Sequence, residues 1–409
     1  MAAKKIHLGI IGLGRAFTIM QPTFLMDPRV EIVAAADPLP HARAQFERDF
    51  AAVVYEDAEQ LCRDPDVDVV YIASPHQFHV AHAKSAMVSG KHILMEKPMA
   101  LTIEDCNQII ALAKQTGAKI VVGHSHSFNT PILMARQLIE EGQWGTVQAI
   151  HAFNFTDFMY RPRRPEELDT SQGGGVVFSQ GAHQLDIIRL LGGGELHTVR
   201  AYTRQWDPAR PSEGFYTALL TFKTGTLANI TYSGYAHFDS DVLLDNIGEM
   251  GQKKDVAAYG QARRFLQNEL AGRTEAELKA ERNYGGRYYR PPALEAPPYH
   301  QHFGHFIISL RHADLRILPN GIEIFADEQR IFHELAAPAL PRKEVIDELY
   351  GAIYQAQPLI HDAVWARGTL EACLALLESA RENREITLQY QYPLPGQGRG
   401  LHSDSPVSP

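Results

Sequence analysis

Ile6-His7-Leu8-Gly9-Ile10-Ile11-Gly12-Leu13-Gly14-Arg15 is the stretch that decides the fold class of this chain. Its apolar part predicts a buried strand, and its Gly-x-Gly ending predicts a tight turn into a helix. A second apolar run covers residues 30–36 and stops on Asp37. A strand, a glycine turn, a helix and a second strand that ends in an acid form the layout of a dinucleotide-binding Rossmann domain.

Each position of the glycine turn has a predicted part in holding the cofactor. Gly12 permits the sharp turn, and Gly14 lets the backbone come close to a pyrophosphate. Arg15 and Ala16 begin the helix, whose N-terminal N–H groups attract the phosphate charge. We therefore expect all four residues to contact the cofactor.

The acid at the end of the second strand decides which dinucleotide is expected. The Asp37 carboxylate can accept hydrogen bonds from a ribose diol, and its charge repels the 2′-phosphate of NADP. It is followed by Pro38, where a serine or an arginine would have indicated NADP. NAD is thus predicted, and NADP is the less favoured alternative because Arg43 lies nearby. The third position of the fingerprint holds Phe17, where glycine or alanine usually stands.

Composition excludes several classes of protein. Hydrophobic residues make up 45% of the 409 residues and charged residues 21%, as in soluble globular proteins. The formal net charge of −9 does not attract nucleic acid, which is itself negatively charged. No apolar run is long enough to span a membrane. No signal-like segment follows Met1, and Cys62, Cys106 and Cys373 suggest neither a disulfide framework nor a metal site. We expect a cytoplasmic protein that binds neither nucleic acid nor a membrane.

The pattern of the chain changes near residue 125. Before it, strand-like and helix-like segments alternate, which predicts an α/β domain with a parallel sheet in residues 1–125. After it, long runs rich in β-branched and aromatic residues predict an α+β domain with a large, mostly antiparallel open sheet in residues 126–392. Residues 393–409, rich in Gly, Ser and Pro, are expected to be disordered. One face of an open sheet is left unpacked within the chain, and a second subunit commonly packs against such a face. We therefore expect a homo-oligomer.

Within the second domain, strong helices are predicted at residues 180–191 and 368–383. We interpret residues 250–300 as an excursion over a site or an interface, partly helical at 261–281. The strands are expected at 147–156, 197–206, 215–222, 226–235 and around 316–334.

The motif Ser74-Pro75-His76-Gln77-Phe78-His79 directly follows the third long apolar strand. Ligands of parallel sheets bind outside the carboxyl ends of the strands, so Ser74, Pro75, His76 and His79 are expected to contact the cofactor. The alternative is a proline-terminated strand followed by a helix cap.

The motif Glu96-Lys97-Pro98 follows the next strand, so its three residues are also expected at the cofactor. Proline restrains Lys97 to an extended backbone, which fixes the direction of its side chain. Beside a positively charged nicotinamide, the Lys97 amine would be pushed towards neutrality and could exchange a proton. The alternative is a surface lysine in a turn.

A glycine run at residues 173–175 leads into a helix that carries Ser179, His183 and Asp186. His183 and Asp186 are three apart and therefore share a helix face. Histidine titrates in the range that alcohol oxidation requires of a base. The alternative is a histidine that is only part of the core.

In their order and separation, these motifs resemble the glucose–fructose oxidoreductase/inositol dehydrogenase (Gfo/Idh/MocA) family over nearly the whole chain. The resemblance implies a Rossmann domain, a second domain that often mediates assembly, a catalytic lysine at Lys97 and a catalytic or substrate-binding histidine at His183. The family often has an aspartate four residues before this histidine, whereas this chain has Ser179. Either Lys97 and His183 suffice, or the substrate supplies a carboxylate.

The loop 160–165 contains three arginines, Arg161, Arg163 and Arg164, which suit the recognition of carboxylates. The alternative is a solvated loop whose arginines pair with nearby acids. His124, close to His126, follows the fifth strand and could add polar contacts to the substrate, as could Ser179, His183 and Asp186. No carboxylate or cysteine spacing completes a metal site around these histidines, so no metal is predicted.

Within the family, the chain looks most like dihydrodiol dehydrogenases of phthalate breakdown. That resemblance implies NAD-dependent oxidation of 4,5-dihydro-4,5-dihydroxyphthalate to 4,5-dihydroxyphthalate. Lys97 would be the acid–base group, His183 would bind the substrate or relay the proton, and the arginine loop would hold the two carboxylates. The alternatives are a dehydrogenase of a sugar, inositol or other acidic polyol, and a cofactor-binding regulator without catalysis.

Overall fold

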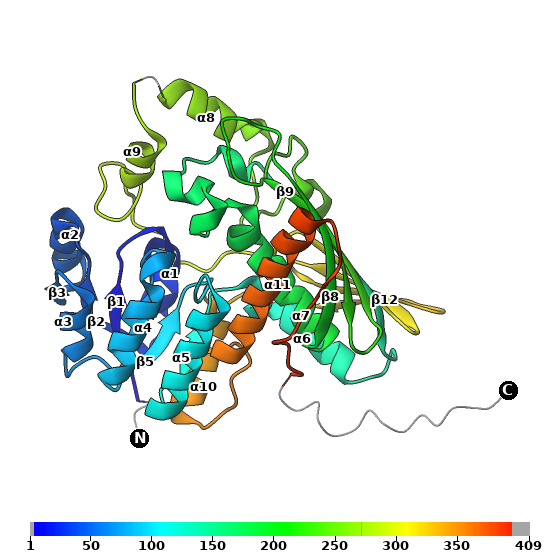
Figure 1. Cartoon of the computed structure of the whole chain (residues 1–409), viewed down its shortest axis with the longest axis horizontal. Helices are drawn as coiled ribbons and strands as arrows, with labels where there is room; N and C mark the ends of the chain where they lie inside the picture. The colour runs from blue at the N-terminus through cyan, green and yellow to red at the C-terminus, as the bar shows by residue number, and fades with distance from the viewer. Residues whose placement is uncertain (1–3, 271, 395–409) are drawn as a thin grey trace.

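A computed structural model describes residues 4–270 and 272–394 and contains two adjoining domains (Figure 1). We predicted a disordered tail over residues 393–409. Residues 395–409 of this tail lie outside the residues that the structure describes. Leu394, the last described residue, is buried against the second domain.

The first domain is a six-stranded sheet in the order β3-β2-β1-β4-β5-β6, and every neighbouring pair is parallel. The order reverses between β1 and β4, so a dinucleotide site is expected at the carboxyl ends of these two strands. This arrangement confirms the predicted Rossmann domain. The strands are β1 (Ile6–Ile11), β2 (Val30–Ala36), β3 (Val53–Tyr55), β4 (Val69–Ile72), β5 (His92–Met95) and β6 (Ile120–Val122).

The unusual Phe17 lies on the first helix of this domain and is fully buried. Its ring packs against Phe46 and Phe50, with centroids 6.0 and 6.1 Å away, and edge-on against Tyr284 at 5.2 Å. Tyr284 belongs to the excursion after residue 250, so this excursion reaches back to the nucleotide domain. The helices here are α1 (Arg15–Met26), α2 (Pro40–Phe50), α3 (Ala58–Arg63), α4 (His79–Val88) and α5 (Ile103–Thr116).

Helix α10 (Lys343–Tyr354), which the sequence analysis did not predict, also packs on the first domain. Val345, Ile346 and Leu349 are buried in the same core as β1 and α1. The chain therefore returns from the second domain to the first before it ends.

The second domain contains a nine-stranded sheet in the order β14-β13-β12-β11-β7-β10-β9-β8-β15. Among its described strands only β7 and β10 pair in parallel, which confirms the mostly antiparallel sheet that the sequence predicts. Its strands are β7 (Val147–Phe155), β8 (Leu196–Arg204), β9 (Phe215–Phe222), β10 (Leu227–Ser233), β11 (His305–Leu310), β12 (Ala313–Leu318), β13 (Gly321–Ala326), β14 (Arg330–Glu334) and β15 (Ile386–Thr387).

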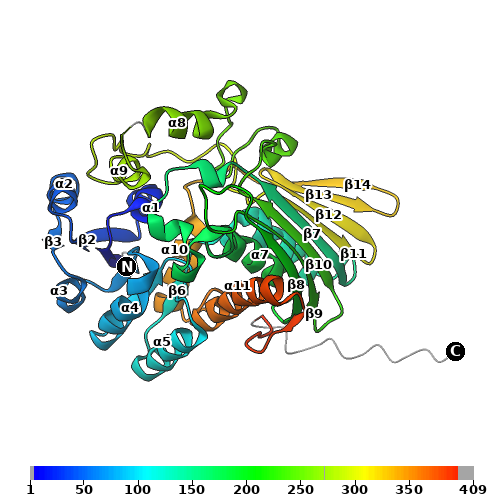
Figure 2. The same cartoon turned by 45° about the horizontal axis from the view of Figure 1, so that its top comes forward.

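Three helices, α6 (Thr130–Glu140), α7 (Ala182–Gly192) and α11 (Ala363–Glu382), cover the face of this sheet that looks towards the first domain (Figures 1 and 2). The last of these begins earlier than expected, because the Asp362 side chain accepts a hydrogen bond from the Trp365 N–H at 2.8 Å and caps it. A π-helical turn, Val177–Gly181, precedes α7.

The excursion is partly helical over residues 261–281, as predicted. The structure has two short helices there, α8 (Gln261–Glu269) and α9 (Glu275–Ala280). A new N-terminus forms at Thr274, whose hydroxyl accepts a hydrogen bond from the Glu277 N–H while the Glu277 carboxylate accepts one from the Thr274 N–H. Just after α9, the Tyr284 hydroxyl donates a hydrogen bond to the Asp49 carboxylate of α2 at 2.6 Å.

Candidate active site

The glycine turn after β1 has the shape that a bound dinucleotide requires. Gly12 has φ of +95°, and a Cβ there would lie 2.8 Å from the Ser74 nitrogen, so only glycine fits. A Cβ at Gly14 would meet nothing within 4 Å, which leaves space beside the backbone for a ligand. Arg15 is exposed at the start of α1, and Ala16 follows it half-buried.

Asp37 at the end of β2 is buried and organises this turn. Its carboxylate accepts hydrogen bonds from the Leu13 N–H at 2.7 Å and from the Leu39 N–H at 2.9 Å. The Arg43 guanidinium donates to the Asp37 carbonyl at 2.7 Å. The open backbone at Gly14, the helix N-terminus and the acid at the strand end together fit NAD.

The loop after β4 is held by His79, which is fully buried. One ring nitrogen lies 2.9 Å from the Pro98 carbonyl, and the other lies 2.9 Å from the Ser74 carbonyl. His79 therefore joins the two loops and positions them, in place of the direct contact with the cofactor that we predicted. Pro75 and His76 remain partly exposed, and burial, with the nearby His79 and Lys97, lowers the pKa of His76 to about 3.

Lys97 joins the two domains. Its ammonium donates a hydrogen bond to the Ser179 carbonyl at 2.7 Å, on the π-helical turn before α7. Burial lowers the pKa of the Lys97 amine, while the carboxylates of Glu96 and Glu249 act in the opposite direction. The neighbouring Glu96 accepts a hydrogen bond from the Tyr71 hydroxyl at 2.6 Å. A lysine whose pKa is lowered at the edge of a Rossmann sheet can serve as a general base.

His183 lies one helical turn beyond Ser179 and is buried. Its Nδ1 has no hydrogen-bond partner among the described residues. Burial and the positive charge of Lys97 lower the pKa of His183 well below its ordinary value, so the imidazole is neutral. The structure thus brings the Lys97 amine and the His183 imidazole together from separate domains.

Ser179 contacts Lys97 through its backbone carbonyl and not through its side chain. The hydroxyl donates to the Gly175 carbonyl of the preceding turn, while the carbonyl accepts from Lys97. Gly175 has φ of +78° and lies against the Glu213 carboxylate, which leaves no room for a side chain. The negative charge that the family often places at position 179 is absent here.

Three histidine rings gather at this point. The His126 ring centroid lies 5.0 Å from that of His124 and 4.9 Å from that of His183. The Asn129 amide nitrogen lies 2.9 Å from Nδ1 of His126 and donates to it, so Nε2 carries the proton and donates to the Glu249 carboxylate at 3.0 Å. In the described chain, no group of three or more His, Cys, Asp or Glu residues is arranged to hold a metal ion.

Glu249 is the acid of this site, and the sequence analysis did not find it. Burial opposes its ionisation, but the hydrogen bond from His126 and the charges of His126 and Arg161 lower its pKa to about 2. The carboxylate is therefore ionised, and its charge acts on Lys97. Glu249 lies 123 residues after His126, and no local spacing in the sequence links the two.

We expect Glu249→Gln to lower kcat by about tenfold, less than the loss of a general base itself would cost. As the predicted general base, Lys97 accepts a proton only as the neutral amine, so the oxidation rate is expected to rise with pH through the Lys97 pKa. The Glu249 charge raises that pKa, so its removal should move the rising limb of the kcat–pH profile to lower pH. Asp245→Asn, at an exposed position of the same loop, is the control and should leave the profile unchanged. An unmoved limb in the Gln variant would assign Glu249 a purely structural role.

The three arginines of the loop 160–165 differ in how closely they are paired within the chain. The Arg164 guanidinium lies 3.1 Å from the Glu166 carboxylate and 3.7 Å from that of Glu167. The Arg163 guanidinium stacks 3.6 Å from the Phe158 ring centroid and donates to the Phe158 carbonyl. These contacts correct the prediction of a three-arginine clamp.

Arg161, by contrast, has a side chain that is 48% exposed. Its one ion pair within the described chain is a loose contact of 3.6 Å with Asp157. The Arg161 charge also acts on Glu249 of the site and on Arg15 at the cofactor turn. It is therefore the most loosely paired arginine of this loop.

Asp186, which we expected to contact the substrate, makes several hydrogen bonds within the protein. It is buried, and its carboxylate accepts hydrogen bonds from the Trp365 indole at 2.6 Å, from the Thr369 hydroxyl at 2.7 Å and from the Ser127 hydroxyl. The three-residue spacing from His183 holds in α7, but Ser127 and two residues of α11, Trp365 and Thr369, donate hydrogen bonds to its oxygens.

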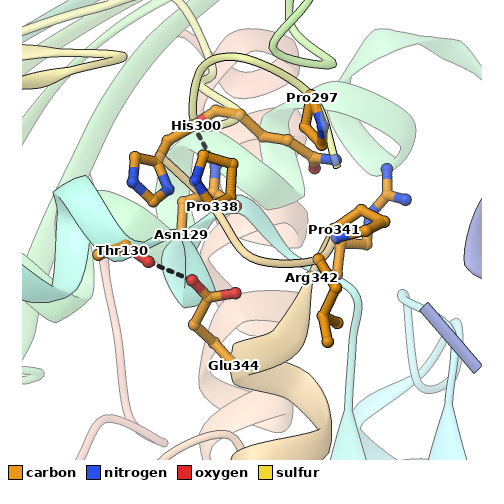
Figure 3. A pocket seen from close by; sticks show the side chains of 10 residues that line it. Asn129, Thr130, Pro297, His300, Pro338, Pro341, Arg342 and Glu344 are labelled. Carbon is orange, nitrogen blue, oxygen red and sulfur yellow. Dashed lines mark hydrogen bonds between the residues drawn. The ribbon is translucent and has the colours of Figure 1, made fainter. Parts of the chain in front are cut away.

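Arg342, which precedes α10, is a buried cation that the sequence analysis missed. It donates to the Ile19 carbonyl at 2.8 Å, and its charge contributes to the lowered pKa values of His124 and His183 after the larger effect of burial. It also lines a cavity of about 20 Å³, where Thr130 donates a hydrogen bond to Glu344 (Figure 3). This cavity is large enough only for water.

Comparison with known proteins shows the family of this chain. Residues 6–124 match the model of an oxidoreductase family with an NAD-binding Rossmann fold, and residues 132–252 match the Gfo/Idh/MocA C-terminal domain. The chain is 48% identical over 377 residues to 1-carboxy-3-chloro-3,4-dihydroxycyclohexa-1,5-diene dehydrogenase of Comamonas testosteroni, with 92% of this chain and 95% of that protein covered.

Two further proteins are similar to this chain, one over part of its length and one over nearly all of it. An inositol 2-dehydrogenase of Saccharopolyspora erythraea is 28% identical over 60% of this chain and 72% of its own length. The crystal structure of a dehydrogenase from Bordetella bronchiseptica superimposes with a TM-score of 0.88 at 38% identity, covering 94% of this chain and all of that one. Across the described residues, no helix has both the length and the apolar character needed to cross a membrane.

Proposed function

Because the chain belongs to the Gfo/Idh/MocA family of NAD-binding oxidoreductases, we propose that it oxidises a carboxylated cis-dihydrodiol to a catechol. The observation that carries this proposal is the meeting of Lys97 and His183 at the edge of the Rossmann sheet. The similarity to a dehydrogenase of a carboxylated dihydroxycyclohexadiene supports the choice of substrate class.

The residues divide the work of such an oxidation. Lys97 accepts the proton of the diol hydroxyl, and the Glu249 charge stabilises the ammonium that forms. Neutral His183 binds the same hydroxyl and keeps it oriented. NAD, when bound, supplies the acceptor for the hydride. The ketone that results enolises to an aromatic catechol, so the reaction is driven forward.

The pairing of the arginines favours one carboxylate on the ring. The phthalate diol that the sequence suggests carries two, but Arg163 and Arg164 have close partners within the chain, and Arg161, with its single contact of 3.6 Å, is the most loosely paired of the three. The relative from Comamonas testosteroni is also named for a substrate with one carboxylate. We therefore place a monocarboxylated cis-dihydrodiol first and 4,5-dihydro-4,5-dihydroxyphthalate second.

A substrate panel tests the proposal by the absorbance of the reduced cofactor. The panel contains a benzoate cis-dihydrodiol, the 4,5-dihydrodiol of phthalate, an uncharged benzene cis-dihydrodiol and myo-inositol, each with NAD and with NADP. We expect the highest kcat/KM for the benzoate diol with NAD. Preferential oxidation of inositol would make the chain a polyol dehydrogenase, and cofactor binding without turnover of any diol would make it a regulator.

We also propose that the open face of the nine-stranded sheet joins two copies of the chain. Paired positions place Leu219, Ile307 and Phe332 in one row across strands β9 to β14, and all three side chains are exposed. Asn229 and His151 lie between Leu219 and Ile307 in this row, and the ion pair of Arg316 and Glu323 lies between Ile307 and Phe332. Exposed apolar side chains on the open face of a sheet are typical of a subunit interface. Location in the cytoplasm stays a prediction.

A further inference from the structure

Gln180, on the π-helical turn before α7, lies next to the Lys97 amine. Its side-chain amide nitrogen lies 3.1 Å from the Ser179 carbonyl oxygen, to which the Lys97 ammonium also donates at 2.7 Å. Two groups that are bound to one oxygen are close neighbours. The Gln180 side chain is only half-buried, so it can contact a ligand that lies beside Lys97.

The hydrogen bonds determine which way the Gln180 amide points. A carbonyl oxygen can only accept, so the amide atom beside the Ser179 carbonyl must be the nitrogen. The amide oxygen then accepts from the Tyr232 hydroxyl at 3.3 Å, and the Thr156 hydroxyl, 2.9 Å away, donates to the Tyr232 oxygen. These bonds engage one of the two amide N–H groups, and the second has no acceptor among the described residues.

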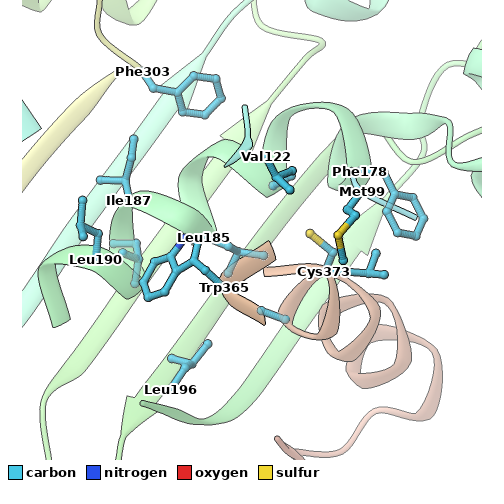
Figure 4. Packing of buried hydrophobic residues seen from close by; sticks show 14 of the residues in the cluster. Met99, Val122, Phe178, Leu185, Ile187, Leu190, Leu196, Phe303, Trp365 and Cys373 are labelled. Atoms are coloured by element: carbon cyan, nitrogen blue, oxygen red, sulfur yellow. The ribbon is translucent and has the colours of Figure 1, made fainter. Parts of the chain in front are cut away.

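Tyr232 is a rigid partner for the amide, because it is fully buried. Its ring centroid lies 6.1 Å from that of Phe303, which lies 5.2 Å from that of His183. Figure 4 shows Phe303 with other buried apolar side chains of this core. Burial raises the pKa of Tyr232, and the nearby charge of Arg161 acts in the opposite direction. The amide is therefore held beside the amine, on the side of the site that Arg161 occupies.

We propose that Gln180 binds the second hydroxyl of a vicinal diol and thereby selects the cis arrangement of its two oxygens. The inference rests on the proposed function, in which Lys97 takes the proton of the hydroxyl that is oxidised. The neighbouring hydroxyl of a cis-diol lies on the same face of the ring, close to the first oxygen. The free N–H of Gln180 donates a hydrogen bond to this neighbouring oxygen, and no covalent bond changes in that contact.

A trans-diol cannot satisfy both groups in the same way. When its first hydroxyl lies at Lys97, its second hydroxyl lies on the opposite face of the ring, away from Gln180. The amide N–H then loses its bond to water without gaining one to the substrate, which weakens binding. A site that is built to hydrogen-bond a hydroxyl group discriminates against a ligand that does not offer one there.

The test compares a cis-diol with its trans isomer, which differs only at the carbon next to the oxidised one. We expect the wild type to prefer the cis-diol by at least about tenfold in kcat/KM. Gln180→Met keeps the length of the side chain and removes the amide, so kcat/KM for the cis-diol should fall by about 3- to 10-fold. The value for the trans isomer should stay within about twofold. Where its turnover is too slow, its inhibition constant against the cis-diol replaces kcat/KM. Gln180→Asn, which keeps an amide but withdraws it by one methylene, should reduce the preference as well if the Met variant folds poorly.

Gln184→Met is the matched control, because it removes the same amide one helical turn further on, where it accepts from the Tyr216 hydroxyl at 2.8 Å. This variant should keep the cis-to-trans ratio of the wild type. Equal losses for both isomers in the Gln180 variants, or an unchanged ratio, would overturn the proposal and leave Gln180 as a support of the Ser179 carbonyl. A wild type that oxidises both isomers equally well would also overturn it.

The same variants separate this inference from the proposed function. If the chain oxidises a polyol but no dihydrodiol, the proposed function is wrong. The role of Gln180 is then judged on that polyol and its epimer at the neighbouring carbon, with the same expected change in the ratio. If no alcohol is oxidised, both proposals fall.

Discussion

Replacement of Lys97 with methionine is expected to lower kcat by a factor of about 10² to 10⁴ with little change in the affinity for NAD. Methionine keeps most of the apolar stem but cannot accept a proton. The amine is the group that meets His183 and Glu249 at the edge of the sheet, so no neighbour can replace it. Stopped-flow formation of reduced cofactor measures the chemical step, and fluorescence titration measures NAD binding.

Lys91→Met is a matched control for the loss of a buried lysine. Lys91 lies at the opposite end of β5, and its ammonium donates to the carbonyls of Asp64 and Val67 at 2.7 Å. This variant should lose stability but keep its kcat, whereas Lys97→Met should lose kcat. Turnover of the Lys97 variant within a few-fold of the wild type would show that another group removes the proton.

The Rossmann half of the molecule could be predicted because its signals are local. Gly12 and Asp37 each have a requirement that is visible in a few residues, a turn without a side chain and an acid at a strand end. The same applies to Lys97 and His183, which lie in short motifs. Helix α10 escaped prediction although it completes the core of this domain, because nothing near it in the sequence shows which sheet it covers.

The charges of the site could not be predicted, because they depend on contacts between distant segments. Glu249 comes close to His126 only once the excursion after β10 has folded over the site. Asp186 has the right spacing from His183, but Trp365 and Thr369 of α11 take up one of its carboxylate oxygens. A sequence shows which side chains share a helix face, and not which neighbour takes up their polar atoms.

The arginine loop gives the sharpest test of substrate class. Arg161→Ala should raise the KM for a carboxylated cis-dihydrodiol by about 10- to 100-fold, since a hydrogen bond to a charged group contributes about 1.5–3 kcal/mol. The KM for an uncharged cis-dihydrodiol should stay within about twofold, because its ring has no carboxylate for the guanidinium. Initial rates with both diols, at saturating NAD, measure the difference.

Arg164→Ala is the matched control for this prediction, since it removes the same charge three positions along the loop. The Arg164 guanidinium is already paired with the carboxylates of Glu166 and Glu167. We therefore do not expect it to bind the carboxylate of the substrate. Its removal should leave the KM for both diols unchanged. If both variants raise the KM for the carboxylated diol equally, the loop acts through its total charge and the assignment to Arg161 is wrong. If Arg161→Ala raises the KM for both diols equally, Arg161 orients the loop or the cofactor, and another residue binds the substrate carboxylate.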